Sequence, residues 1–471
     1  MFPKRGQYFF IMALHSKDFS YLCEINYQYK NTRMNVMKFG GTSVGSAQRI
    51  KEVAGLVTQR GKNIVVLSAM SGTTNTLVEI SEYLYKRNID GAKETINKLE
   101  NAYMRTINEL YTSEAAREEA VREVKSSFNY IRTFTKDIFT LFEEKEILAQ
   151  GELMSTAMFN VYLRHELSVN SVLLPALDFM RTDKNAEPDA QYIRQKLYAL
   201  LEKHNDADIY ITQGFICRNA YGEIDNLQRG GSDYTASLIG AAINADEIEI
   251  WTDIDGMHNN DPRFVEGTAP VHELHFEEAA ELAYFGAKIL HPTCVLPAKL
   301  NNIPVRLLNT MQPDAEGTLI HNHQAPKSIK AVAAKDNITA IKIKSGRMLL
   351  AYGFLRKVFE VFETYQTPID MIATSEVGVS LTIDNERNLD GILDDLRKFG
   401  TVTIDRDMVI ICVVGDLEWQ NCGFEAEALD ALKDIPVRMI SYGGSNYNIS
   451  FLIRKEDKVK ALNLLSERLF K

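Results

Sequence analysis

Two hydrophobic periods alternate along the first part of this chain. Short continuous apolar runs are typical of parallel strands buried on both faces, whereas the segment after Ser46, a candidate N-cap, has apolar residues at helical spacing. After a first strand just beyond Met34, the pattern predicts strands at 64–67, 171–174, 208–212, 247–251 and 303–308, and long helices at 76–110 and 114–148. This order predicts an α/β fold for residues 34–325, a three-layer α/β/α sandwich around a mainly parallel sheet.

The pattern changes at about residue 326, where a β-α-β-β arrangement occurs twice. The expected segments are 338–344, 354–365, 368–375 and 379–383, and then 409–414, 424–432, 435–442 and 449–453. Two ferredoxin-like α+β units are therefore predicted. We expect a closing helix at 457–470 to complete the first unit, 326–400 with 454–471. The second unit, 401–453, would then be inserted into the first.

Residues 1–33 form an N-terminal extension that we interpret separately. They carry two early positive charges and a short apolar run, Tyr8 to Leu14. A secretory signal peptide is the alternative, but the run is short and no small-residue cleavage motif follows it cleanly. We expect Met34 to be the biological start and the extension to be dispensable or mis-assigned.

Composition narrows the classes of function. A formal net charge of −10 argues against nucleic acid as the main partner, since nucleic-acid-binding proteins usually carry a basic face. No uninterrupted apolar run reaches the roughly 18 residues of a membrane span. The five cysteines are scattered and show no CxxC spacing, which predicts reduced thiols in a cytoplasmic protein and no zinc site.

The heptapeptide KFGGTSV, which begins at Lys38, lies between the first strand and a helix. Gly40 and Gly41 let the backbone bend sharply and bring its N–H groups close to an anion, while Lys38 adds a mobile positive charge. The following helix contributes unpaired N–H groups at its start. The spacing matches neither Walker A nor GxGxxG. Phosphate binding is one interpretation, and an ordinary turn rich in glycine and hydroxyl groups, Thr42 and Ser43, is the other.

Further polar motifs follow other expected strands, where ligands bind in parallel α/β sheets. They are SAMSGTTN at 68–75, RGGSD at 229–233, TD at 252–253 with DPR at 261–263, and FGAKILHP at 285–292. Each could be only a turn or a helix cap. Two Gly-Gly bends together with a lysine and two arginines at strand ends favour an anionic, phosphorylated ligand.

These motifs, with QGE, RTD, TQGF and WTDIDG, together resemble the aspartate kinases of the amino acid kinase superfamily. The resemblance runs from Met34 to the C-terminus and favours the monofunctional class with a lysine-responsive regulatory region. The two C-terminal units look like a tandem of ACT domains, which bind amino acids. No dinucleotide fingerprint follows, so a fused homoserine dehydrogenase is not expected.

The resemblance implies transfer of the ATP γ-phosphoryl group to the side-chain carboxylate of L-aspartate. Because this carboxylate is already ionised at neutral pH, no general base is needed, and positioning with charge neutralisation should suffice. Lys38 would contact the transferring phosphate and Asp233 would orient Lys38. The alternative role for Asp233 is a helix cap or a bond within the Gly-Gly turn.

The resemblance also assigns the substrate residues. Arg229 would hold the α-carboxylate and Glu152 the amino group, although Glu152 could instead be a helix N-terminal acid. The remaining substrate-side residues are Gly40, Gly41, Thr42, Ser43, Ser68, Thr74, Gly230, Gly231 and Ser232. The ATP-side residues are Lys38, Thr252, Asp253, His258, Arg263 and Lys288. For His258 the alternative is an exposed histidine without a ligand. Mg²⁺ should accompany ATP, with no protein ligand assigned.

An amino-acid effector, most consistent with L-lysine, is expected in the ACT domains. The residues at the corresponding positions are Met348, Ala351, Phe354, Leu355, Pro368, Ile369, Asp370, Ser375 and Glu376. Ala351 and Pro368 depart from the family pattern by replacing small polar residues. We interpret Phe354 and Leu355 as the core face of a helix, and Asp370 as the contact for the effector ammonium.

A homodimer through the ACT domains is implied, and the enzyme would open the biosynthesis of lysine, threonine and methionine. The competing hypothesis is a non-catalytic amino-acid sensor with the same fold. Intact Lys38, Glu152, Arg229 and Asp233 favour the enzyme, because a sensor has no need of a phosphate-binding bend.

Overall fold

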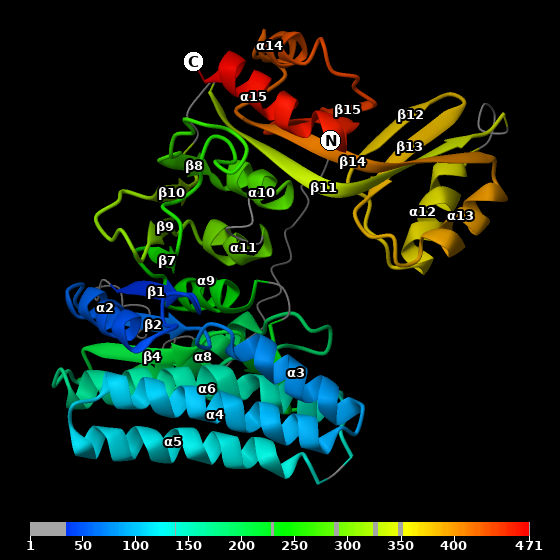
Figure 1. The fold of residues 1–471 in the computed structure, drawn as a ribbon. Helices are drawn as coiled ribbons and strands as arrows, with labels where there is room; N and C mark the ends of the chain where they lie inside the picture. The colour runs from blue at the N-terminus through cyan, green and yellow to red at the C-terminus, as the bar shows by residue number, and fades with distance from the viewer. Residues whose placement is uncertain are drawn as a thin grey trace, which may run out of the picture.

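The computed structural model describes residues 34–136, 138–227, 230–286, 292–323, 328–346 and 352–470. An eight-stranded sheet forms the middle of the N-terminal domain (Figure 1). Its strands are β1 (Asn35–Phe39), β2 (Asn63–Leu67), β3 (Ser171–Leu173), β4 (Ile209–Gln213), β7 (Ile248–Thr252), β8 (Glu273–His275), β9 (Val305–Asn309) and β10 (Thr318–His321). The order is β3-β4-β2-β1-β7-β9-β10-β8, and every neighbouring pair is parallel except β9 with β10. This confirms the predicted mainly parallel sheet.

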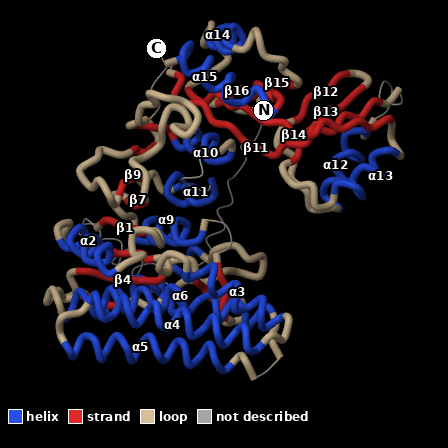
Figure 2. The backbone as a smooth tube through the Cα atoms, in the orientation of Figure 1, coloured by secondary structure: helices blue, strands red, loops and turns tan. Residues whose placement is uncertain are grey.

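Helices cover both faces of this sheet (Figure 2). One apolar core joins the sheet to α2 (Ala47–Thr58), α3 (Thr73–Tyr85), α4 (Ile89–Leu110), α5 (Glu114–Thr133) and α6 (Leu141–His165). The other joins it to α7 (Ala176–Phe179), α8 (Ala190–Lys203), α9 (Gly231–Ile243), α10 (Phe276–Tyr284) and α11 (Pro292–Leu300). A small hairpin of β5 (Ile216–Arg218) and β6 (Ile224–Asn226) follows β4. The three-layer prediction is therefore confirmed.

Each of the two long predicted helices is in fact two helices. The segment 76–110 is broken between α3 and α4, where Arg87 has a positive φ of 56° and Asn88 caps α4 by accepting from the Gly91 N–H at 3.0 Å. The segment 114–148 is broken before Thr140, which opens α6 with a capping box. N-cap residues thus begin a second helix inside each predicted segment, a boundary that hydrophobic periodicity alone does not indicate.

A six-stranded antiparallel sheet forms the C-terminal part, in the order β12-β13-β11-β14-β16-β15. Its strands are β11 (Ile329–Lys344), β12 (Ile372–Ser375), β13 (Gly378–Ile383), β14 (Thr401–Gly415), β15 (Met439–Tyr442) and β16 (Asn448–Arg454). β11 and β14 are long and pair with each other along both repeats. The two repeats thus share one continuous sheet.

Two helices pack on each half of this sheet. α12 (Phe354–Thr364) and α13 (Leu389–Arg397) share one apolar core, and α14 (Phe424–Ala431) and α15 (Lys458–Leu469) share another, with η3 (Lys455–Asp457) leading into α15. The expectation that the closing helix completes the first unit is therefore wrong. The sequence analysis did not identify α13, which already supplies the second helix of the first unit, so α15 packs on α14 instead.

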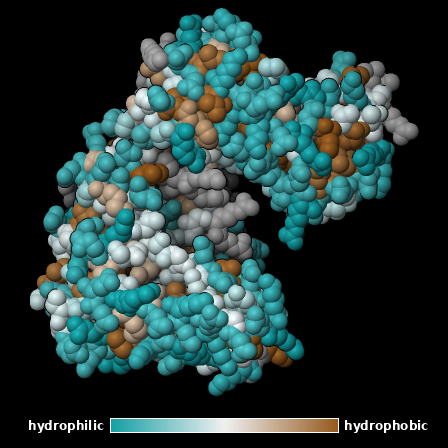
Figure 3. All heavy atoms as spheres, viewed as in Figure 1, coloured by the Kyte–Doolittle hydropathy of each residue, from teal (hydrophilic) through white to brown (hydrophobic). Residues whose placement is uncertain are grey.

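Hydrophobic side chains also reach the surface of the C-terminal part. α12 exposes Leu355 and Phe359, and Figure 3 shows brown patches on the lobe that carries α12 and α13.

Within the described residues, no helix is long and apolar enough to cross a membrane.

The C-terminal sheet packs directly on the N-terminal domain. Apolar residues of α10 share a core with β11 and β14, and Figure 1 shows α10 lying against these strands. The Val332 N–H donates to the Asn259 carbonyl at 2.8 Å, and Asn260 Nδ2 donates to the Leu462 carbonyl at 3.0 Å. The loop after β7 is therefore bonded to both β11 and α15.

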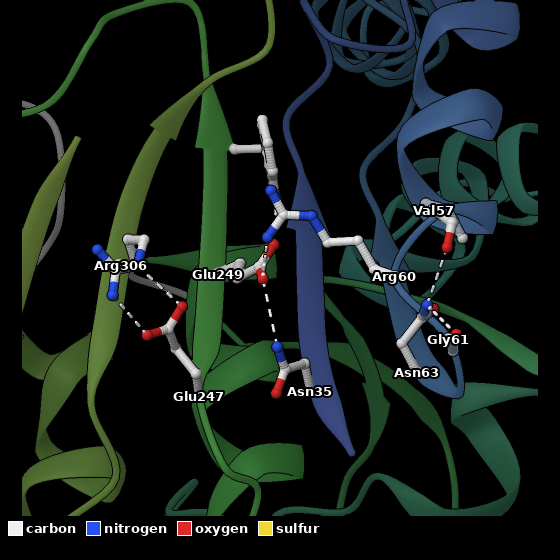
Figure 4. A network of polar contacts seen from close by, with 9 residues as sticks. Asn35, Val57, Arg60, Gly61, Asn63, Glu247, Glu249 and Arg306 are labelled. Atoms are coloured by element: carbon white, nitrogen blue, oxygen red, sulfur yellow. Dashed lines mark hydrogen bonds and ion pairs between the residues drawn. The ribbon is translucent and has the colours of Figure 1, made fainter. Parts of the chain in front are cut away.

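Polar contacts tie together the strand ends opposite the carboxyl edge (Figure 4). The buried carboxylate of Glu249 accepts from Arg60 Nη1 at 2.7 Å and from Asn35 Nδ2 at 3.3 Å. Glu247 accepts from Arg306 Nε at 2.9 Å. These contacts join β1, β7 and β9 at one end, while the other end remains available for a ligand.

Candidate active site

The carboxyl ends of β1, β2 and β4 border a cavity of about 410 Å³. It is lined by 41–42, by residues within 68–75, by 231–232, and by Glu152 and Phe215. β2 and β7 flank β1 on opposite sides, so the cavity lies where the connections diverge along the sheet. The two predicted Gly-Gly bends thus contribute to one shared cavity.

Lys38 and Asp233 form a close ion pair at this edge. Lys38 Nζ lies 2.5 Å from Asp233 Oδ1, and both side chains are largely buried. Lys38 comes from the end of β1, and Asp233 from the first turn of α9. The pair fixes the direction of the ammonium group. A Cβ at Gly40 would lie 3.6 Å from that nitrogen, which is an ordinary van der Waals distance.

Glycine allows the second bend to approach its neighbours closely. Gly230 and Gly231 have positive φ values of 83° and 44°, which favour glycine, and Gly230 caps α9. A Cβ at Gly214 would lie 2.4 Å from the Ser232 Cβ. The loop after β4 therefore lies directly against the start of α9. A helix start offers N–H groups and a partial positive charge to an anion.

The predicted hydroxyl residues have different surroundings. Ser68 Oγ bonds to Ser232 Oγ at 2.8 Å, and Thr74 lines the cavity. Ser43 does not line it, because its fully buried hydroxyl lies 2.7 Å from Thr310 Oγ1. Ser43 therefore joins the first bend to the segment after β9, which differs from the expected substrate contact.

Glu152 is a buried acid with an unused oxygen. Its side chain comes from α6, where Oε1 accepts from the Ala69 N–H at 3.2 Å. Oε2 has no hydrogen-bond partner among the residues that the structure describes. Burial raises the pKa of Glu152 to about 7. Its position in the middle of α6, far from the first turn, excludes the helix N-terminal role. A ligand cation would satisfy Oε2 and favour the ionised form.

The ATP-side residues Thr252, Asp253, His258 and Arg263 lie in and after the end of β7. This loop borders a second cavity of about 390 Å³, together with Gly286 and the 332–334 segment of β11. His258 Nε2 lies 2.9 Å from Asp255 Oδ1 and Nδ1 lies 3.1 Å from Thr268 Oγ1, so the ring is held within the loop. Thr252 Oγ1 donates to Asp253 Oδ1 at 3.2 Å.

The Arg263 guanidinium projects from this loop toward solvent. It pairs with Asp261 at 2.6 Å, and its side chain is 74% exposed. It is therefore available for a phosphate without unfolding the loop. Arg229 and Lys288, assigned to the substrate and to ATP, lie outside the described residues.

The expected effector residues are partly in the core and partly at the surface. Phe354 packs in the core of α12 and α13, as interpreted, whereas Leu355 is 37% exposed and the core interpretation is wrong for it. Met348 and Ala351 lie outside the described residues, Ile369 is partly buried, and Pro368, Ser375 and Glu376 are exposed. Asp370 Oδ1 lies 2.6 Å from Lys335 Nζ.

Some lining residues were not assigned from sequence. Phe215, Asn75 and Ser71 border the main cavity, and Phe215 has an unusual positive φ of 68°. Each lies inside or beside a motif that followed an expected strand, so motif position was the signal that could have found them. Tyr284 likewise lies directly before the motif at 285–292, whereas Thr310 lies outside the motifs and sequence offered no such signal for it.

Comparisons with known proteins agree with this architecture. A family model described as the amino acid kinase family matches residues 33–309, and an ACT domain model matches residues 411–469, which include α15. The fold and its cleft thus define a kinase of the amino acid kinase family with a C-terminal ACT region.

The relatives identify the family more closely. The lysine-sensitive aspartokinase 3 of Escherichia coli is 33% identical over 449 residues, which cover 92% of this chain and 99% of the relative. The crystal structure of E. coli aspartokinase III in complex with aspartate and ADP (R-state) matches with a TM-score of 0.80 at 33% identity, over 93% of this chain and 100% of that one. Its complex with lysine and aspartate (T-state) matches with a TM-score of 0.77 at 34% identity, over the same shares. The chain belongs to the aspartokinase family and is an aspartate kinase.

Proposed function

We propose that this aspartate kinase transfers the γ-phosphoryl group of ATP to the β-carboxylate of L-aspartate, giving 4-phospho-L-aspartate and ADP. The convergence of both glycine bends and Glu152 on one cavity is the observation that carries the proposal. The Lys38–Asp233 ion pair joins the two bends, since Lys38 precedes the first and Asp233 follows the lining residue Ser232. The E. coli relative was crystallised with aspartate and ADP, which supports the same pair of ligands here.

The reaction brings an ionised carboxylate up to a polyanionic phosphate, so repulsion between them is the main barrier. The Lys38 ammonium would neutralise charge on the transferring group, and its ion pair with Asp233 holds it in place. The N–H groups at the start of α9 would stabilise the same charge. Because the acceptor is already ionised, no residue has to remove a proton from it.

Glu152 would bind the substrate amino group through its unpartnered oxygen. An ammonium placed there would satisfy a buried acceptor and keep the acid ionised. Ser68, Thr74 and Ser232 would donate to the substrate carboxylates, with Arg229 holding the α-carboxylate. Gly40, Gly41, Thr42, Gly230 and Gly231 would supply backbone contacts.

Thr252, Asp253, His258, Arg263 and Lys288 would form the nucleotide side. His258 would act through the loop that it stabilises, since Asp255 and Thr268 already engage both ring nitrogens.

Mg²⁺ would be bound mainly by the ATP phosphates and water. The described residues include no group of three or more His, Cys, Asp or Glu side chains that could hold a metal ion, so they do not form a protein cage. When bound, the ion would reduce the negative charge of the phosphates. The protein's own contribution to neutralising the phosphate charge would come from Lys38 and the N–H groups at the start of α9.

Regulation by an amino acid bound to the ACT region, L-lysine in the first instance, is part of the proposal. The name of the E. coli relative and its complex with lysine support it. Asp370 would receive the effector ammonium. The other proposed effector residues are Met348, Ala351, Phe354, Leu355, Pro368, Ile369, Ser375 and Glu376.

The proposed assembly is a homodimer through the ACT domains, and the proposed location is the cytoplasm. Edge strand β12 and the exposed apolar residues Leu355 and Phe359 offer a surface for a second copy. The scattered cysteines fit a reducing compartment. The product would enter lysine, threonine, methionine and diaminopimelate biosynthesis.

Trapping of aspartyl phosphate as its hydroxamate, with ATP, Mg²⁺ and L-aspartate, tests the reaction. The full chain should form the hydroxamate, and L-glutamate should replace L-aspartate poorly. Absence of product at every Mg²⁺ concentration would eliminate the kinase and favour the amino-acid sensor.

A further inference from the structure

A buried carboxylate at the domain boundary is bound by a cation from its own chain. The Asp370 side chain is only 1% exposed, and its Oδ1 lies 2.6 Å from Lys335 Nζ. Lys335 also lies 2.9 Å from Asp384 Oδ2. Asp370 Oδ2 has no partner within the described ranges of the chain. Lys335 thus engages one carboxylate oxygen, and the other is buried without a described partner, so a ligand reaches this carboxylate only when Lys335 moves away.

The surroundings of the Lys335 ammonium resemble a binding site for an alkylammonium ligand. Two carboxylates flank it, and the Tyr284 ring lies beneath it with 4.2 Å between Nζ and the ring centroid. Carboxylates and an aromatic face are the groups that stabilise a desolvated ammonium. Lys335 therefore places the same chemical group on Asp370 that a free amino acid would bring.

Tyr284 connects this cluster to the N-terminal domain. It is the last residue of α10, and its hydroxyl donates to Asp370 Oδ1 at 2.6 Å. Two residues later, Gly286 has a φ of 129° and approaches β11 so closely that a Cβ would lie 2.2 Å from the Ala334 carbonyl oxygen. The hydrogen bond from Tyr284 therefore links the position of the Asp370 carboxylate to the end of α10.

The same segment of β11 borders the nucleotide-side cavity. Residues 332–334 and Gly286 line the cavity of about 390 Å³, and Lys335 is the next residue along the strand. The Val332 N–H also holds the Asn259 carbonyl of the nucleotide loop at 2.8 Å. A shift of the β11 backbone at Lys335 would therefore move the wall of this cavity.

We infer that Lys335 is a built-in competitor for the effector carboxylate: a cationic amino acid must displace it from Asp370, and the displacement weakens ATP binding through Tyr284 and β11. The inference rests on the proposed regulation and extends it, because it identifies what the effector replaces. The energetic cost of displacing Lys335 sets the sensitivity to the effector.

The test uses the full chain, the hydroxamate assay at sub-saturating ATP, and L-lysine as the probe. In Lys335→Met the competing ammonium is gone, so L-lysine should bind at least about fivefold more tightly by calorimetry, and the KM for ATP should already be raised without lysine. Lys335→Arg keeps a cation and should behave as the unaltered chain does. Lys344→Met removes an exposed lysine from the same strand and is the matched control. L-Lysine should raise KM for ATP more than KM for aspartate.

A second pair of variants covers the case in which Lys335→Met does not fold. Asp384→Asn loosens Lys335 from one side and should shift lysine sensitivity in the same direction by a smaller factor. Tyr284→Phe should still bind lysine, measured calorimetrically, but transmit a smaller change to the KM for ATP.

Unchanged or weaker lysine binding to Lys335→Met overturns the inference, as does the absence of any response to lysine in both the variant and the unaltered chain. Turnover without lysine reports separately on the proposed reaction. If the chain makes no hydroxamate, calorimetric binding of lysine to the same variants still decides, with tighter binding to Lys335→Met expected.

Discussion

The buried acid in the active-site cavity predicts a pH dependence of substrate binding. Glu152 has its pKa raised to about 7 by burial, so near neutral pH it is partly protonated when the cavity is empty. Its proposed partner is the ammonium group of aspartate, which binds the ionised form. Aspartate binding should therefore release a proton and become tighter as pH rises.

The size of the effect follows from that pKa. At pH 6 only about 10% of Glu152 would be ionised, and at pH 8 about 90%. If only the ionised form binds, the apparent KM for aspartate falls about tenfold between these pH values, with most of the change below pH 7.

Initial rates at saturating ATP, measured with varied aspartate from pH 6 to pH 8, provide the assay. Glu152→Gln keeps the shape of the side chain without its titration, so its higher KM should not change over this range. A KM for aspartate that stays constant or rises with pH in the unaltered chain would refute the reasoning, as would an equal slope in Glu152→Gln. Calorimetry in buffers of different ionisation enthalpy should detect the released proton.

Three further results are expected. Lys38→Ala should lower kcat by at least about 100-fold in the hydroxamate assay, because it removes the charge aimed at the phosphate; a normal rate would reject its role. Gly214→Ala should destabilise the chain by about 2 kcal/mol or more in urea unfolding, because its Cβ would lie 2.4 Å from the Ser232 Cβ; an unchanged midpoint would contradict the close approach. The folded-state pKa of Glu152 lies above its unfolded value, so the contribution of Glu152 to the stability of the chain should fall as pH rises between about 4.5 and 7. Glu152→Gln should escape this loss and be up to about 3 kcal/mol more stable at pH 8, with no such difference below pH 4.5; equal stabilities at pH 8 would count against the raised pKa.

Hydrophobic pattern predicted the central strands well because each is short and buried on both faces. It failed where local bonds outweigh periodicity, as at Asn88 and Thr140, whose caps divide the predicted long helices. It also missed α13, and that omission assigned α15 to the wrong repeat. The partner of an amphipathic helix depends on tertiary packing, which a repeat pattern does not contain.

Motif spacing located most of the active-site cavity, because parallel strands bring their carboxyl ends together. It could not separate hydroxyls that face the cavity from those that hold the scaffold, as Ser43 and Thr310 show. It also gave no sign of the Lys335–Asp370 contact, since an ion pair between residues distant in sequence leaves no local pattern. The sequence likewise did not predict that Glu152 is buried, because burial depends on tertiary packing.

The β11–β14 ladder, which runs through both repeats with register shifts along its length, has a consequence for how the regulatory half unfolds. Neither ACT unit has a complete set of strands of its own, because both units share β11 and β14 and the backbone hydrogen bonds between these two strands. The pair should therefore open as one foldon, with amide hydrogens at both ends of β11 exchanging at a common rate under native conditions. Weakening one unit would then lower the protection of the other.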